Sequence, residues 1–244
     1  MLDTAVIAIV IVGALAGGFV SGLTGFGTAL TALGIWLRVL PADAASALAA
    51  CCSIASQLQT LPAIWHTVDR VRIWPMLAAG VLGVPLGTRL LAMLDPGTFR
   101  VCVGVLLISF SGFVLVVRQP RITRGGRAAD AAVGFGGGIL GGLAGLSGVL
   151  PIMWATLRGW GKDERRAMFQ MFNLTILSAT VLSRAGAGVL TRDFLWLFLL
   201  ALPGTFSGAW LGFSVYRRLS DRRFRNIVLG LLAVSGLTLL WPAL

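Results

Sequence analysis

Charged residues are scarce in this sequence, and acidic ones are the scarcest. Of 244 residues only 12% are charged, just nine of these are Asp or Glu, and 57% are hydrophobic. A soluble domain carries about 25% charged residues, so this chain has too little polar surface to cover a water-soluble globule. Long apolar runs with charges at their edges are typical of membrane-spanning helices.

Residues that catalyse reactions or bind metals are also few. The chain has one His and three Cys, and the cysteines lie inside apolar runs without the spacing of metal ligands. The nine acidic residues stand at the edges of apolar runs, so there is no mid-membrane carboxylate of the kind proton pumps use. The sequence also lacks the phosphate-binding GxxxxGK[ST] loop. We therefore expect no enzyme activity, no metal and no cofactor, and the coupling ion is left open.

Basic residues give the chain a net charge of +11. In a soluble protein this charge would suggest nucleic-acid binding, but here the basic residues sit in short loops without interleaved aromatics. They fit the positive-inside rule, by which Arg and Lys hold loops in the cytoplasm. We expect the lipid bilayer and a small anion as partners and no nucleic acid, while a homo-oligomer is left open.

Hydrophobic segments predict an all-α polytopic membrane protein. Eight apolar runs cover residues 4–40, 42–65, 73–94, 98–117, 129–160, 166–190, 193–216 and 224–243. Most of them match the roughly 20 helical residues that cross a bilayer core. Runs 4–40 and 129–160 are too long for one crossing, and glycines interrupt both. We expect each of these two to form a hairpin of two short helices.

The two glycine breaks resemble each other. One spans Gly22 to Gly27 and the other Gly142 to Gly148, 120 residues later. The segment Leu82–Gly87 resembles Ser207–Gly212 at an offset of 125. Two transmembrane repeats, residues 1–120 and 121–244, are the simplest explanation, and chance matches among 32 glycines are the alternative.

Charge predicts how the chain crosses the membrane. With two hairpins, four basic loops share one side, among them the loop carrying Arg158, Lys162, Arg165 and Arg166. The repeats then point in opposite directions. Inverted repeats with broken helices recur in secondary transporters. We expect a multi-pass protein of the inner (plasma) membrane with both termini outside.

The motif pattern resembles a known family. The break Gly22-Leu23-Thr24-Gly25-Phe26-Gly27, the Ala/Ser-rich stretch Ala44–Ser56 and the segment Leu82–Gly87 recur around a basic central loop. This arrangement resembles the sulfite exporter TauE/SafE family, also called the toluene-sulfonate uptake permease family. The resemblance implies a secondary transporter for sulfite, a sulfonate or a related sulfur-containing anion. The first break lacks the proline that many members carry there, whereas the second keeps Pro151.

Each break is a candidate binding site for the anion. Where a helix restarts after a break, its first N–H groups have no partner in the helix and its dipole is positive, so an anion is stabilised there. We expect the two breaks to face each other near the middle of the membrane, although close helix packing would also explain the glycines. The candidates are Ser21, Gly22, Thr24, Gly25, Gly27, Thr28, Gly142, Gly145, Ser147 and Gly148.

Polar residues on the spans after the breaks complete the predicted site. Amides in a membrane are costly unless paired, so we expect them to face the bundle interior, either to join helices or to contact substrate. They are Ser53, Ser56, Gln57, Gln59, Gln170, Asn173 and Ser178. Arg89 and Arg184 lie near the ends of their spans, where a guanidinium would bind a sulfonate or snorkel to the interface.

The sequence therefore predicts a secondary transporter for a small anion, working by alternating access of one half against the other. The alternatives are a channel, a non-transporting membrane subunit and, least favoured, an intramembrane enzyme, which would need a nucleophile with its base.

Overall fold

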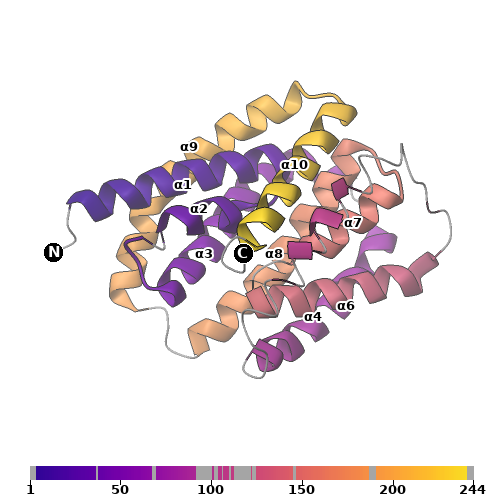
Figure 1. The fold of residues 1–244 in the computed structure, drawn as a ribbon, viewed down its shortest axis with the longest axis horizontal. Helices are drawn as coiled ribbons and strands as arrows, with labels where there is room; N and C mark the ends of the chain where they lie inside the picture. Colours follow the sequence, from indigo (N-terminus) through magenta and orange to yellow (C-terminus); the bar gives the residue numbers. More distant parts are fainter. Residues whose placement is uncertain are drawn as a thin grey trace. The chain divides into compact units, whose positions relative to one another are not determined.

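The computed structural model of this protein is helical throughout the part that it describes (Figure 1). It describes residues 4–36, 38–67, 70–91, 101, 104–105, 107–109, 111–112, 122, 125–144, 147–186 and 191–240. The helices are α1 (Thr4–Thr24), α2 (Thr28–Trp36), α3 (Ala42–Thr60), α4 (Arg70–Leu91), α6 (Gly126–Ala144), α7 (Val149–Leu157), α8 (Lys162–Gly186), α9 (Arg192–Arg217) and α10 (Asp221–Leu240), with short 3₁₀ turns at Leu61–Ala63 and Trp65–Thr67. The predicted all-α fold is confirmed.

Within the described part of the chain, four stretches of helix are long and apolar enough to cross a membrane. They are Thr4–Thr24, Ala44–Ala63, Ile73–Leu90 and Arg192–Arg217. Each coincides with one of the predicted apolar runs, so the polytopic character of the chain is confirmed. The run 98–117 lies mostly outside the described residues.

Both long runs are broken where the glycines predicted. In the first, α1 ends at Thr24 and α2 begins at Thr28. In the second, α6 ends at Ala144 and α7 begins at Val149. The physical reason is visible at the first break, where Gly25 and Gly27 have φ of 86° and 92°. Residues with a side chain rarely adopt this left-handed conformation.

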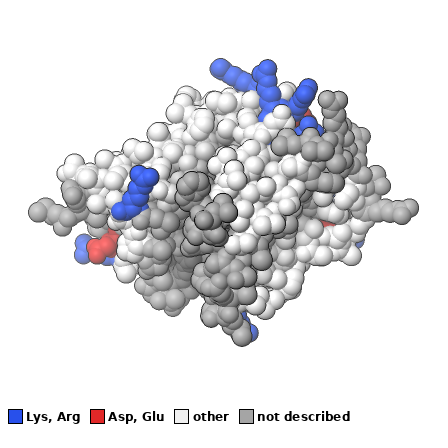
Figure 2. Space-filling view, viewed as in Figure 1, with Lys and Arg blue, Asp and Glu red and all other residues white. Residues whose placement is uncertain are grey.

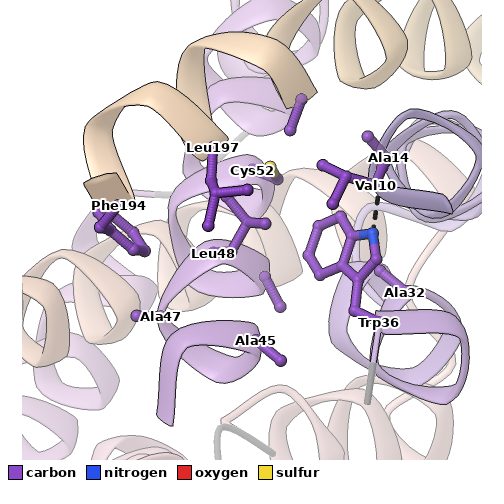
Figure 3. Packing of buried hydrophobic residues seen from close by; sticks show 12 residues of the cluster. Val10, Ala14, Ala32, Trp36, Ala45, Ala47, Leu48, Cys52, Phe194 and Leu197 are labelled. Atoms are coloured by element: carbon purple, nitrogen blue, oxygen red, sulfur yellow. Dashed lines mark hydrogen bonds between the residues drawn. The ribbon is translucent and has the colours of Figure 1, made fainter. Parts of the chain in front are cut away.

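The first break makes a hairpin, because α2 folds back along α1. The indole Nε1 of Trp36, the last residue of α2, donates to the carbonyl oxygen of Val10 over 3.1 Å (Figure 3). Gly13 leaves the space for this ring, since a methyl group there would overlap the indole. Around the indole, Ala14, Ala32 and Leu48 are fully buried in a core shared by α1, α2, α3 and α9.

The second break makes a similar hairpin from α6 and α7. The indole Nε1 of Trp154 donates to the carboxylate of Asp130 over 2.7 Å. Nearer the break, a methyl group at Gly136 would contact the side chain of Leu150. Each hairpin is thus closed by a tryptophan of its short helix that reaches back to the long one.

The chain divides into two compact units. The first comprises residues Met1–Val68 and Arg166–Leu219, and the second comprises residues Asp69–Arg165 and Ser220–Leu244. Each unit therefore takes helices from both halves of the sequence. In the first, α1 packs along α9, and in the second, α4 packs along α6 (Figure 1).

Glycines bring the helices of these two pairs into backbone contact. A methyl group at Gly208 of α9 would overlap the carbonyl oxygen of Leu15, and one at Gly212 would overlap that of Phe19. In the other pair, a methyl group at Gly83 or Gly87 of α4 would overlap the carbonyl oxygen of Phe135 or Ile139, respectively. Such small-residue interfaces let membrane helices approach closely, where apolar burial alone would not drive association.

The exterior of the described residues is largely apolar. On α9 the exposed large side chains are Leu195, Trp196, Leu199, Phe206, Trp210, Leu211 and Val215. Among the described residues in Figure 2, most of the surface is uncharged, and Lys, Arg, Asp and Glu form a few small groups. A surface of this kind suits contact with lipid.

Candidate functional site

Local hydrogen bonds stabilise the non-helical backbone of the first break. The Thr24 hydroxyl lies 2.8 Å from the carbonyl oxygens of Val20 and of Phe26, and the Phe26 N–H reaches it over 3.4 Å. This hydroxyl therefore satisfies the backbone where the helix stops. The chain then turns through Gly27 and restarts at Thr28, the first residue of α2.

A buried arginine lies against this break. Arg166, near the start of α8, is fully buried and donates from Nη1 to the carbonyl oxygen of Leu23 over 2.9 Å. Its guanidinium carbon lies 4.0 Å from the ring centre of Tyr216 and 4.9 Å from that of Phe213. The cation sits at the negative end of the α1 dipole and over two aromatic rings, and both stabilise its charge.

Gln170, one helical turn after Arg166, lies against the same glycine. A methyl group at Gly25 would be 3.2 Å from Cγ of Arg166 and 3.2 Å from Cγ of Gln170. The Gln170 amide donates from Nε2 to the Thr60 hydroxyl, which in turn donates to the carbonyl oxygen of Ser56. The Gln170 and Thr60 side chains are buried.

A chain of polar groups continues from there along α3. The hydroxyls of Ser21 and Ser56 are 2.7 Å apart, which ties α1 to α3. The Ser53 hydroxyl accepts from Gln57 Nε2 over 2.8 Å and from Asn173 Nδ2 over 3.4 Å, which ties α3 to α8. The buried amides of Asn173 and Gln170 join α8 to α3, as one of the two sequence interpretations proposed, whereas that of Gln57 bonds within α3.

Three uncharged side chains of this unit each carry a buried polar atom that has no hydrogen-bond partner among the described residues. These atoms are Thr28 Oγ1, Gln57 Oε1 and Gln170 Oε1. The side chains of all three residues are at most 1% exposed. A buried polar atom left without a partner costs about 1–3 kcal/mol, so each of these atoms indicates a place where a ligand or water belongs. Of the three residues, Gln170 lies beside Arg166, since both flank Gly25.

The structure brings together nine of the predicted site residues in the first unit. They are Ser21, Gly22, Thr24, Gly25, Gly27, Thr28, Gln57 and the α8 pair Gln170 and Asn173, with only Gly22 serving the contact between α1 and α9 rather than the polar network. Gly142, Ser147 and Gly148 belong to the second unit, where Gly142 packs against Val84 of α4 and Ser147 is buried. That the two breaks face each other stays a prediction.

The remaining site predictions have mixed outcomes. Gly145 and the Arg184 side chain lie outside the described residues. Arg89 is in the last turn of α4 and exposed. The expectation that Gln59 faces the interior is wrong: it is exposed, because it lies two residues after Gln57 and thus points to nearly the opposite side of α3.

The prediction from sequence that Arg166 lies in a basic loop is wrong. Since α8 already begins at Lys162, Arg166 is a helical residue, and the helix turns its side chain inward. Arg165 also lies in α8 and is buried, with its guanidinium carbon 5.7 Å from the ring centre of Phe224. One sequence signal could have revealed the site: Arg166, Gln170 and Asn173 have the i, i+4, i+7 spacing of one helix face.

The fold and this site define the class of the protein. It is a multi-pass helical membrane protein with broken-helix hairpins and a buried cation beside one break. A family model described as "Sulfite exporter TauE/SafE" matches residues 9–239, so the chain belongs to the TauE/SafE sulfite exporter family, whose members are membrane transporters. No curated protein and no solved structure is similar enough to the chain to count as a match.

Proposed function

We propose that this protein is a secondary transporter that carries a small sulfur-containing anion, sulfite or a sulfonate, by alternating access. The observation that carries the proposal is the fully buried Arg166 at the first break. A buried charge in a membrane protein is expensive and is a functional site by default. Its planar guanidinium suits the oxygens of a sulfite or sulfonate group, which accept paired hydrogen bonds.

Other groups at the first break also support an anion as the ligand. The first N–H groups of α2 follow the break, and they carry the positive end of that helix dipole. Thr28, the first residue of α2, adds a buried hydroxyl without a partner among the described residues. Membership of the sulfite exporter family supports sulfite as the first substrate to test.

Uptake of radiolabelled sulfite into proteoliposomes tests this proposal. Saturable uptake at low turnover, absent from protein-free liposomes, is the expected result, and its response to an imposed pH gradient identifies the coupling. Flux that rises linearly with concentration would identify a channel instead. Absence of flux with both sulfite and a small sulfonate would refute the proposed function.

We further propose that the protein lies in the inner membrane with both termini outside. The excess of basic residues in four predicted loops supports this orientation. In a variant whose native cysteines are replaced by Ala, a cysteine added at either end should react with a membrane-impermeant maleimide in intact cells. Labelling only after the membrane is permeabilised would reverse the orientation.

A further inference from the structure

We propose that Gln170 selects an anion that carries a hydrogen-bond donor, so that the transported form of sulfite is hydrogensulfite. This inference rests on the proposed function and names the chemical form of its substrate. It starts from the difference between the two side chains that flank Gly25: Arg166 has donors only, whereas Gln170 presents an acceptor.

The hydrogen bonds around Gln170 determine which amide atom is available. The Thr60 hydroxyl has a single proton, which it donates to the carbonyl oxygen of Ser56 over 2.9 Å. It can therefore only accept from Gln170, and this fixes Nε2 toward Thr60. The other amide atom, Oε1, is left buried and without a partner among the described residues.

A ligand with both kinds of hydrogen-bonding group would complete this site. Arg166 and Gln170 both have Cγ 3.2 Å from the position of a methyl group on Gly25, so the two side chains flank the same point of the break. The proposed ligand binds there between the guanidinium and Gln170 Oε1. The S–OH form of hydrogensulfite has two oxygens for the guanidinium and one O–H for Gln170 Oε1. The sulfite dianion and simple alkyl sulfonates offer acceptors only, and would leave Oε1 without a partner.

The missing hydrogen bond predicts how strongly the site prefers hydrogensulfite over anions without a hydrogen-bond donor. Sites built to hydrogen-bond a hydroxyl reject analogues that lack it, because a buried polar group is then left unpaired. The cost of one such group, about 1–3 kcal/mol, corresponds to roughly a 5- to 150-fold loss of affinity.

Methanesulfinate is the matched probe, because it replaces the hydroxyl of hydrogensulfite by a methyl group at the same charge. In proteoliposomes at one mildly acidic pH, uptake of labelled sulfite is measured against unlabelled sulfite and against methanesulfinate. With the wild-type protein, methanesulfinate should inhibit at least about fivefold more weakly than sulfite. Equal inhibition by the two compounds would overturn the inference, with no variant needed.

Two variants assign the discrimination to Gln170. Gln170→Leu removes the acceptor, so it should weaken inhibition by unlabelled sulfite and leave inhibition by methanesulfinate unchanged. The inhibitory concentrations of the two compounds should then lie within about threefold of each other. Gln59→Leu makes the same change at an exposed position of α3 and should keep the wild-type ratio. An unchanged ratio in Gln170→Leu with saturable flux would refute this inference alone, whereas absence of sulfite flux in the wild type would refute the proposed function as well.

Discussion

Arg166 is the residue on which the proposed chemistry depends. It supplies a permanent charge at the break, and it also holds the last turn of α1 through the carbonyl oxygen of Leu23. The two roles are compatible, because one guanidinium carries five N–H donors. A substitution that keeps the size of the side chain and removes its charge separates binding from packing.

Arg166→Gln should reduce the uptake of sulfite by about 10- to 100-fold, because hydrogen bonds to a charged group contribute about 1.5–3 kcal/mol. Uptake into proteoliposomes measures the effect, and size-exclusion chromatography in detergent shows whether the variant is folded. Arg218→Gln, at an exposed arginine, is the control. Wild-type uptake by Arg166→Gln would exclude this residue from the site.

The conformation of the first break requires glycine at position 25. Its φ of 86° is strained for a residue with a side chain, and a Cβ would press on the stems of Arg166 and Gln170. Gly25→Val should therefore abolish transport while folded protein remains in the membrane.

Gly34→Val is the matched control for that prediction. Gly34 lies in α2, and a methyl group there would have no heavy atom within 4 Å. Uptake and the yield of protein in the membrane are measured for both variants. If Gly25→Val transports at the wild-type rate, the break is a packing feature and does not bind substrate.

Helix pairing is the feature that organises each compact unit. In both pairs, α1 with α9 and α4 with α6, glycines make the contact. The contact glycines of α1 recur in α6 at an offset of 120, and those of α4 recur in α9 at an offset of 125. Gly18 contacts Thr205 as Gly138 contacts Gly80, and Gly22 contacts Ala209 as Gly142 contacts Val84. Matched contacts of this kind support the prediction that the chain contains two repeats.

Gly208→Val should destabilise the pair of α1 and α9, because the new side chain would overlap the backbone of α1. Overpacking of this kind costs about 1–3 kcal/mol or more. The midpoint of thermal unfolding in detergent should fall, whereas Gly230→Val, at a position of α10 with no heavy atom within 4 Å, should leave it unchanged. Equal midpoints for the two variants would mean that the backbone contact does not stabilise the protein.

The repeats predicted from the sequence and the compact units of the structure divide the chain at different places. The predicted repeats are residues 1–120 and 121–244, whereas each compact unit contains parts of both. One contact supports a two-fold relation between the repeats: Ser53 and Asn173, equivalent at the offset of 120, hydrogen-bond to each other. Residues related by a two-fold axis can touch only close to that axis. The repeat boundary itself and the opposite orientation of the repeats stay predictions.

We expect α1 and α9 to move together during transport, because glycines bring their backbones into contact. A Cβ at Gly204 would lie 3.2 Å from Cβ of Ala14, close to the mean of about 3.8 Å in disulfides. In a protein with its native cysteines replaced by Ala, Ala14→Cys with Gly204→Cys should form a disulfide on oxidation and retain sulfite uptake. Loss of maleimide-reactive thiols measures the disulfide. Loss of uptake that a reductant restores would show that the two sequence halves move apart here.

Hydropathy and glycine placement were sufficient to predict a polytopic helical protein broken near residues 25 and 145, because both signals act within a single segment. The length of an apolar run limits how often it crosses a bilayer, and a glycine permits a left-handed turn whatever surrounds it. Membership of the family also followed from these local motifs. The burial of Arg166, the exposure of Gln59 and the pairing of α1 with α9 did not follow. Those features depend on which face of each helix meets another helix, and residues more than a hundred positions apart set that orientation.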